Sequence, residues 1–191
     1  MMQRSLSPVY VALVHHPVYN KNRRVVRTCL TPLDLHDISR ACRTYGVHAF
    51  YFINPMRSQR DLGQMIFDHW NTGWGARYNP NRKEAISLIR IAPDLEGPRK
   101  DIEQEWGSPP KTVATSARMT STDLDYPEMR TRIRKGEDAF LLLFVTGWGL
   151  LEEDIEAADY RLLPILGAGE FNHLSVRSAV SIILDRILCD R

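Results

Sequence analysis

The segment 138–145, which reads DAFLLLFV, limits the possible folds of this chain more than any other part of the sequence. Its apolar run is unbroken and lacks the alternation of apolar and polar residues that a half-exposed strand shows. Strands that are apolar on both faces are typical of the centre of a parallel sheet with helices on each side. The segment therefore predicts a layered α/β fold.

The rest of the chain alternates between strand and helix signals. Apolar or β-branched runs predict strands at 9–15, 47–53, 88–92 and 111–115. Apolar spacing of three or four residues, with start and stop signals such as Pro32 and Gly46, predicts helices at 34–45, 62–70, 94–106 and 125–135. A loop is expected over 71–81 and a short helical piece from Arg82. This order predicts a mostly parallel sheet flanked by helices, and 191 residues suit a single domain over 1–191.

The segment 170–186, EFNHLSVRSAVSIILDR, combines a polar turn with a helix that is apolar on most of its circumference. A terminal helix of this kind needs cover on two sides. The sheet can supply one side, and a second subunit is the simplest supplier of the other, which predicts a homodimer through the C-terminal helix. The alternative is a helix tucked inside its own domain.

Several classes of protein are disfavoured by the sequence. The longest apolar runs fall well short of the roughly 20 residues that cross a bilayer, and no small-residue cleavage site follows the N-terminal run, so a cytoplasmic protein is expected. Cys29, Cys42 and Cys189 lack paired spacing, which argues against a disulfide framework and a zinc site. A metal hydrolase is disfavoured because no ligand spacing links the histidines, which include His15, His36, His69 and His173.

The net charge of +2 is small, but 20 of the 25 cationic residues are Arg. The planar guanidinium group suits phosphate. Two clusters stand out, at 21–27 and 130–135. Each is either a solvated face or part of a nucleic-acid footprint.

Ligands of open α/β sheets collect beyond the carboxyl ends of the strands. Three loops at such ends, 115–118, 146–149 and 163–175, offer small residues, backbone donors and apolar side chains. This combination suits a nucleoside. Gly147 and Gly149 permit a positive φ or a close backbone approach, although a tight turn after a buried strand uses the same residues.

Several motifs, in order, resemble those of the SPOUT, or trefoil-knot, RNA methyltransferases. The segment 163–165 (LPI), followed by 173–176 (HLSV), is similar to the last motif of that class. The segment 142–150 (LLFVTGWGL) is similar to its second motif, and 34–40 (DLHDISR) is similar to its first. The match is nearest to a small one-domain bacterial group of SAM-dependent RNA methyltransferases. Motifs of that group appear here at 15–22 (HHPVYNKN), 78–85 (YNPNRKEA) and 172–179 (NHLSVRSA).

The resemblance implies a deep C-terminal trefoil knot (the SPOUT, or alpha-beta knot, fold), a dimer built around the terminal helix, and S-adenosylmethionine as cofactor. It also implies an RNA substrate, no metal and no membrane. Carried across motif by motif, the cofactor-binding residues are Thr115, Ser116, Thr146, Gly147, Gly149, Leu163, Ile165, Asn172, His173 and Leu174.

The same resemblance places Arg40 near the substrate phosphate or base, so Arg40 is the first candidate catalytic residue. Asp34 and His36 are candidates for the base or an orienting acceptor, although Asp34 could equally be the N-terminal cap of its helix. Asp34 stands where the ribose-methylating branch usually has Asn, so the resemblance does not carry over 2′-hydroxyl chemistry. Val145 stands where related motifs often have Gly, so any positive φ in this turn must fall at Gly147 or Gly149.

Three functions are compatible with these residues. The first is a homodimeric RNA methyltransferase, acting on tRNA or rRNA, whose Arg side chains bind phosphates. The second is a non-catalytic RNA-binding module that retains the nucleoside pocket. The third is a methyltransferase that acts on a protein or a small molecule.

Overall fold

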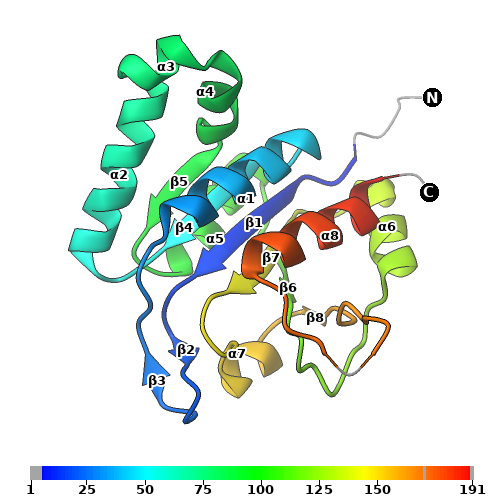
Figure 1. Ribbon diagram of the computed structural model, residues 1–191. Coiled ribbons are helices and arrows are strands. Elements are labelled where there is room, and N and C mark those ends of the chain that lie inside the picture. Colours follow the sequence, from blue (N-terminus) through cyan, green and yellow to red (C-terminus); the bar gives the residue numbers. More distant parts are fainter. Residues whose placement is uncertain (1–5, 170, 190–191) are drawn as a thin grey trace, which may run out of the picture.

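The computed structural model describes residues 6–169 and 171–189, and Figure 1 shows a twisted sheet with helices on both faces. The strands are β1 (Val9–Val14), β2 (Val18–Tyr19), β3 (Val25–Val26), β4 (Ala49–Ile53), β5 (Ile89–Ala92), β6 (Lys111–Ala114), β7 (Phe140–Val145) and β8 (Tyr160–Arg161). The helices are α1 (Pro32–Thr44), α2 (Arg57–Asn71), α3 (Trp74–Tyr78), α4 (Pro80–Ile86), α5 (Glu96–Trp106), α6 (Tyr126–Lys135), α7 (Glu152–Glu156) and α8 (Val176–Leu188).

Six strands form one sheet in the order β5-β4-β1-β7-β6-β8, and every pairing between them is parallel. The apolar run that predicted a central strand is β7, which pairs with β1 on one side and β6 on the other. β2 and β3 form a separate antiparallel pair. The predicted mostly parallel sheet flanked by helices is confirmed.

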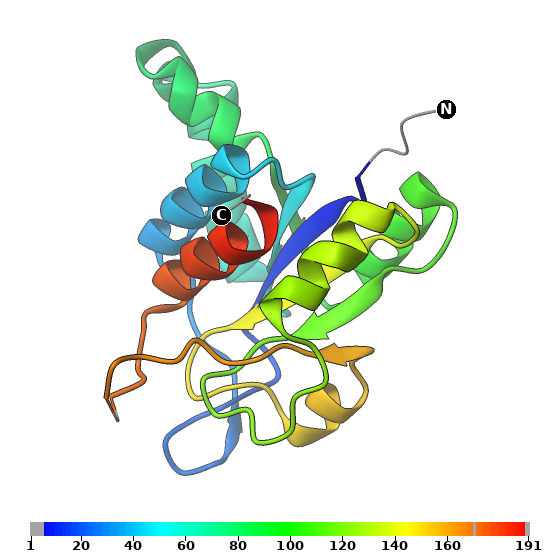
Figure 2. The ribbon, with the colours of Figure 1, turned by 90° about the vertical axis from the view of Figure 1, so that its right-hand side faces the viewer.

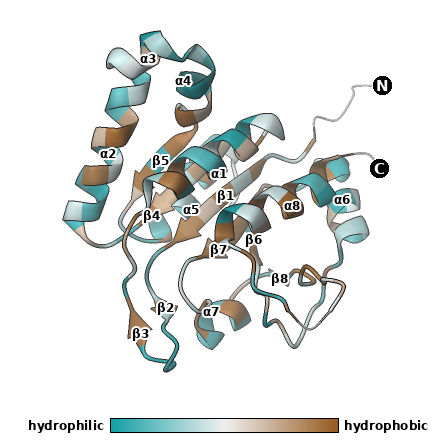
Figure 3. Cartoon of the chain, in the orientation of Figure 1, coloured by the Kyte–Doolittle hydropathy of each residue, from teal (hydrophilic) through white to brown (hydrophobic). Residues whose placement is uncertain are grey.

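Two hydrophobic cores explain why the central strands carry no polar face. Alternate residues of β1 point to opposite sides of the sheet. Val11 and Leu13 pack with α1, α4, α6 and α8, whereas Tyr10 and Ala12 pack with α5 and α7. In Figure 3 the central strands are coloured mainly as hydrophobic, while the outer surfaces of the helices are largely hydrophilic.

Helix α1 begins at a well-defined cap. Thr31 accepts a hydrogen bond from the backbone N–H of Asp34, and Pro32 occupies the first turn. The alternative that Asp34 itself caps this helix is therefore wrong. Asp34 lies in the first turn instead, where its carboxylate accepts a hydrogen bond from the Thr31 hydroxyl.

The loop predicted over 71–81 is also wrong, because it contains α3, and α4 begins at Pro80 rather than at Arg82. The Gly, Asn and Pro residues here start and stop short helices. Asn79 ends α3 and caps α4, accepting a hydrogen bond from the Arg82 N–H.

Helix α8 packs against α1 and α6 (Figure 2). Its inner face is fully buried and consists of Val180, Ile183, Leu184 and Ile187. Ile182 and Leu188 are only half-buried, so one side of the apolar helix is incompletely covered within the chain.

The segment 162–175 runs beside the segment that follows β6. Leu162 forms a parallel bridge with Leu124, and the N–H of Leu163 donates to the Leu124 carbonyl at 2.9 Å. Further along, the Asn172 side chain donates to the Ala117 carbonyl at 3.2 Å. The two segments thus lie together, as a knotted chain requires, while the threading itself stays a prediction. Within the described residues, no helix has the length and apolarity needed to cross a membrane.

Candidate functional site

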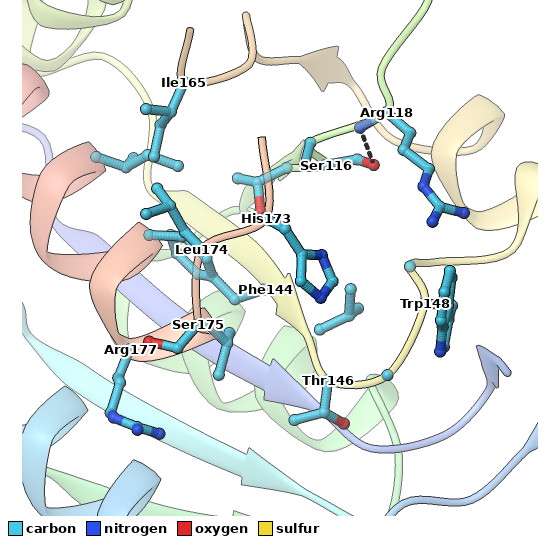
Figure 4. A pocket seen from close by; sticks show the side chains of 18 of the residues that line it. Ser116, Arg118, Phe144, Thr146, Trp148, Ile165, His173, Leu174, Ser175 and Arg177 are labelled. Carbon is cyan, nitrogen blue, oxygen red and sulfur yellow. Dashed lines mark hydrogen bonds between the residues drawn. The ribbon is translucent and has the colours of Figure 1, made fainter. Parts of the chain in front are cut away.

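A cavity of about 460 Å³ opens beyond the carboxyl ends of β6, β7 and β8 (Figure 4). Its walls come from the segments after these strands, from the segment between β3 and α1, and from the first turns of α8. Residues that are distant in the sequence therefore meet at one edge of the sheet, as expected for an open parallel sheet.

The first wall is the turn after β7. Gly147 has φ +74° and Gly149 has φ +113°, a region that L side chains rarely adopt. A Cβ atom on Gly147 would also lie only 2.9 Å from the carbonyl oxygen of Tyr19. The prediction that the positive φ falls at Gly147 or Gly149 is confirmed at both, and at Gly147 the close backbone approach independently excludes a side chain.

The second wall is the loop after β6. The Thr115 hydroxyl donates to the Leu143 carbonyl at 2.8 Å, which ties this loop to β7. The Ser116 hydroxyl accepts from the backbone N–H of Arg118 at 3.1 Å. These two bonds fix the loop conformation at the rim of the cavity, and the Arg118 side chain extends towards Trp148 (Figure 4).

The third wall comes from residues 163–165 and from residues 172–175, which lead into α8. Leu163 and Ile165 pack against the core and give this wall an apolar surface. Ser175 caps α8 by accepting a hydrogen bond from the Ser178 N–H. The polar turn before α8 therefore both caps the helix and borders the cavity.

Charged groups meet at the α1 side of the cavity. The Asp34 carboxylate, only 5% exposed, pairs with Arg177 of α8 at 3.1 Å and also accepts a hydrogen bond from the Thr31 hydroxyl. Arg177 reaches Asp37 as well, at 3.5 Å. This network places one carboxylate acceptor at the wall of an otherwise largely apolar cavity.

An aromatic rim faces the charged side. Trp148 is 43% exposed, and the guanidinium carbon of Arg118 lies 4.8 Å from its ring centroid. The His173 ring lies 6.3 Å from Trp148 between centroids (Figure 4). Planar groups with a cation over one face are suited to contact a nucleobase or a ribose phosphate.

All ten residues expected to bind the cofactor line this cavity, and Asp34 lines it too. Arg40 and His36 do not. Arg40 is exposed on the outer side of α1. His36 packs edge-on against Trp70, with ring centroids 5.6 Å apart, and burial followed by the charge of Arg82 lowers its pKa.

Sequence reasoning missed the segment between β3 and α1. It placed Arg118 and Trp148 within the candidate loops 115–118 and 146–149 but gave neither them nor Arg177 an individual role. Arg177 stood within the quoted motif 172–179 and Trp148 within 142–150, so a signal was present for both. Thr28 gave no local signal. It reaches the cavity because its hydroxyl contacts that of Thr146, a contact between distant segments.

His15 lies behind the cavity, fully buried at the end of β1. Within the described residues, neither ring nitrogen has a hydrogen-bond partner, and the ring lies edge-on to Phe52. Burial lowers the pKa of His15 to about 4, so the ring is neutral at physiological pH. His16, the next residue, is half-buried and faces the Val26 carbonyl instead. Across the described chain, no three His, Cys, Asp or Glu side chains are grouped to hold a metal.

The comparisons with known proteins agree on methyltransferases that act on RNA. A family model described as SAM-dependent RNA methyltransferase matches residues 8–189. The chain is 40% identical over 179 residues to an uncharacterised protein of Aquifex aeolicus, which covers 94% of this chain and 87% of that protein. It is 42% identical over 182 residues to a tRNA (guanine-N(1)-)-methyltransferase of Oleidesulfovibrio alaskensis. That match covers 95% of this chain but only 42% of that longer protein.

Solved structures share the fold at low sequence identity. A SpoU methyltransferase, AviRb of Streptomyces viridochromogenes, in complex with the cofactor AdoMet, aligns with a TM-score of 0.56 at 16% identity, covering 97% of this chain and 58% of that chain. A probable methyltransferase of Bordetella pertussis aligns with a TM-score of 0.62 at 12% identity, covering 97% of both chains. TrmJ of Z. mobilis aligns at 0.59 and 14% identity, covering 98% and 70%.

Proposed function

This chain belongs to the family of SAM-dependent RNA methyltransferases, and on that premise we propose that it transfers the methyl group of S-adenosylmethionine to a nucleotide of RNA in the cytoplasm. One observation carries the proposal. The ten residues expected from sequence motifs to bind the cofactor come from three separate loops and line a single cavity. We propose tRNA as the first substrate to test, because a relative that matches this chain over part of its length carries that name.

The cavity fits an adenosyl group in size and chemistry. Its volume of about 460 Å³ lies in the range of cavities that bind small organic ligands. Leu163 and Ile165 offer an apolar surface for the flat base, and the turn after β7 leaves open space beside Gly149, where a Cβ atom would meet nothing within 4 Å. The hydroxyl groups of Thr115 and Ser116 stand at the rim for polar contacts.

When bound, S-adenosylmethionine supplies a methyl group on a positively charged sulfur. The protein's part is to orient the RNA nucleophile and to receive its proton. Asp34 is the acidic side chain in the cavity wall, and an ionised carboxylate accepts hydrogen bonds. Because Arg177 and Thr31 hold this carboxylate from two sides, its orientation is set before RNA arrives.

We assign Arg40 to the RNA rather than to the cofactor. Leu33, Asp37 and Arg40 lie along the exposed stripe of α1, and Asp37 is linked to the cavity wall through Arg177. Arg40 forms no ion pair within residues 6–169 and 171–189, so its guanidinium is available for a phosphate. We assign His36, which packs against Trp70, to the positioning of α1 against α2.

We also propose that two copies of the chain associate through α8. Four residues of this helix are buried against the same chain, whereas Ile182 and Leu188 keep part of their apolar surface exposed. A symmetric dimer places this surface against the identical surface of a second copy.

The direct test is transfer of a labelled methyl group from S-adenosylmethionine to RNA, followed by mass spectrometry of the digested nucleosides. The purified protein should label total tRNA or rRNA taken from a strain that lacks the gene, and should not label RNA from the parent strain, whose site is already methylated. Binding of the cofactor without any transfer to RNA would instead favour the non-catalytic RNA-binding module. Labelling of a protein or a small molecule would favour the third function.

A further inference from the structure

A pair of aromatic side chains is displayed on the surface away from the cavity. The chain between β4 and β5 makes a helical excursion, α2 to α4, that stands beside the sheet (Figure 1). Within it, Trp74 is 66% exposed and Tyr78 is 70% exposed. Their rings are stacked, with centroids 4.9 Å apart and an interplanar angle of 17°. Each ring therefore has one face against its neighbour and the other available to a ligand.

This pair rests on a rigid base. Helix α3 crosses close over Trp70, because a Cβ atom on Gly75 would lie 2.7 Å from the Trp70 ring. Trp70 is held in turn by His36 and His69, both edge-on, and by Arg82, whose guanidinium carbon lies 4.4 Å from a Trp70 ring centroid. Helix α3, which carries both exposed rings, is thus anchored on Trp70 before any partner binds, which lowers the entropic cost of stacking.

The charge around the pair is positive. The acidic side chains of the excursion have partners: Asp61 pairs with Arg57, Asp68 accepts from Gln64, and Glu84 pairs with Arg43. In contrast, the exposed cations Arg40, Arg77 and Lys83 form no ion pair among the residues that the structure describes. Flat rings flanked by free cations are the combination that binds unpaired nucleotides, through base stacking and phosphate contacts.

The excursion is connected to the cavity through α1. Helix α1 packs against α8 on one side and α4 on the other. Its exposed stripe carries Asp37, which is linked to Arg177 of the cavity wall, and then Arg40, one turn further along. A single polynucleotide could therefore extend from the cavity along α1 to the aromatic pair.

We propose that Trp74 and Tyr78 form a docking platform for unpaired bases of the RNA substrate, at a distance from the nucleotide that is methylated. This inference rests on the proposed function and names a second region of contact with the same substrate. The platform would select RNA with an unpaired segment beside the target nucleotide, because a fully paired helix does not offer splayed bases.

The experiment compares wild-type protein with W74A, Y78A and the double variant, using fluorescence anisotropy with labelled single-stranded oligoribonucleotides and with total tRNA. The double variant should bind single-stranded RNA roughly 10-fold or more weakly, while Trp74→Phe, which keeps an aromatic face, should stay near wild type. The matched control is Leu6→Ala, which removes an exposed apolar side chain elsewhere on the surface. Thermal unfolding and calorimetry with S-adenosylmethionine check that the variants are folded and that the cavity is intact.

The outcomes separate this inference from the proposed function. Unchanged RNA affinity in the folded double variant overturns the platform but leaves methyl transfer untouched. A change in molar mass by light scattering, without a change in RNA affinity, would mean that the aromatic face is an interface with another protein chain, which also overturns it. Loss of RNA binding with normal cofactor binding supports the platform, whatever the identity of the methylated nucleotide.

Discussion

The Arg177 guanidinium lies 3.1 Å from the Asp34 carboxylate and joins the first turn of α8 to the first turn of α1 at the cavity wall. The two residues are far apart in the sequence, yet they meet at the cavity beyond the carboxyl ends of the strands. Their contact links α8 to the residue that we propose as the proton acceptor.

We expect Asp34→Asn to bind S-adenosylmethionine within about twofold of wild type and to lose roughly 100-fold or more in transfer rate. The amide keeps the size of the carboxylate but removes its negative charge. Calorimetry and the labelled-methyl assay measure the two effects separately. Normal turnover in the Asn variant would mean that another group receives the proton.

Arg177→Ala tests the other half of the pair. Its loss leaves the buried Asp34 carboxylate without its cationic partner, so the free energy of unfolding should fall by about 1–2 kcal/mol, a figure reduced because Arg177 is partly exposed. Urea unfolding measures this change. Lys83→Ala, which removes an exposed cation that forms no ion pair among the described residues, is the control.

Gly147 and Gly149 offer a matched pair of backbone variants. Gly147→Ala must adopt a positive φ and also bring a Cβ atom to 2.9 Å from the Tyr19 carbonyl oxygen, whereas a Cβ atom on Gly149 meets nothing within 4 Å. We expect roughly tenfold weaker binding of S-adenosylmethionine for Gly147→Ala and a smaller effect for Gly149→Ala. Equal affinities would show that the turn after β7 is not shaped as described.

Arg40→Ala should leave cofactor affinity nearly unchanged, because Arg40 does not line the cavity, and should abolish transfer to RNA. Arg43→Ala, one turn along α1 and paired with Glu84, is the control and should keep most activity. A mutant at position 40 with normal turnover removes Arg40 from the reaction.

The buried ring of His15 makes a pH prediction. Its pKa in the folded chain, about 4, lies below the ordinary value of 6.5, so the unfolded chain binds more protons between these values. The stabilising effect is complete above pH 6.5 and is lost as the pH falls towards 4, by up to roughly 3 kcal/mol. Urea unfolding of wild type and His15→Gln between pH 4 and 7 isolates this group from the carboxylates. Parallel stability curves for the two proteins would contradict the assignment.

Light scattering tests the proposed dimer. Ile182→Glu places a charge on the half-buried apolar side of α8 and should shift the protein towards the monomer. Gln104→Glu, at an exposed position of α5 on the opposite face of the sheet, should not. A wild-type protein that is already a monomer at high concentration would rule the dimer out.

The fold was predictable from the sequence where burial on both faces of a strand requires apolar residues throughout. Phe140–Val145 could only be a central strand, because it carries no polar face. The predicted loop over 71–81 was wrong for a physical reason: α3 is short, rich in Gly at its start, and held by packing on Trp70 rather than by its own propensity.

The site was partly predictable as well. Loops at the carboxyl ends of parallel strands converge, so residues 115–116, 146–149, 163–165 and 172–174 were brought together as expected. Thr28 was not found, because its place at the cavity depends on a contact with Thr146 that no local pattern encodes. Arg177 lies within the motif 172–179 but was given no role, because its pairing with Asp34 joins distant segments. The prediction of a trefoil knot came from the family resemblance and not from periodicity, since hydrophobic patterns do not show whether the chain passes through a loop.

The most direct test of the central claim is a calorimetric titration of the purified chain with S-adenosylmethionine, in parallel with Gly147→Ala. We predict saturable binding of one cofactor per chain, and weaker binding in the variant, which remains folded. An absence of binding heat at millimolar cofactor, confirmed by no shift in thermal unfolding, would contradict the assignment of this cavity.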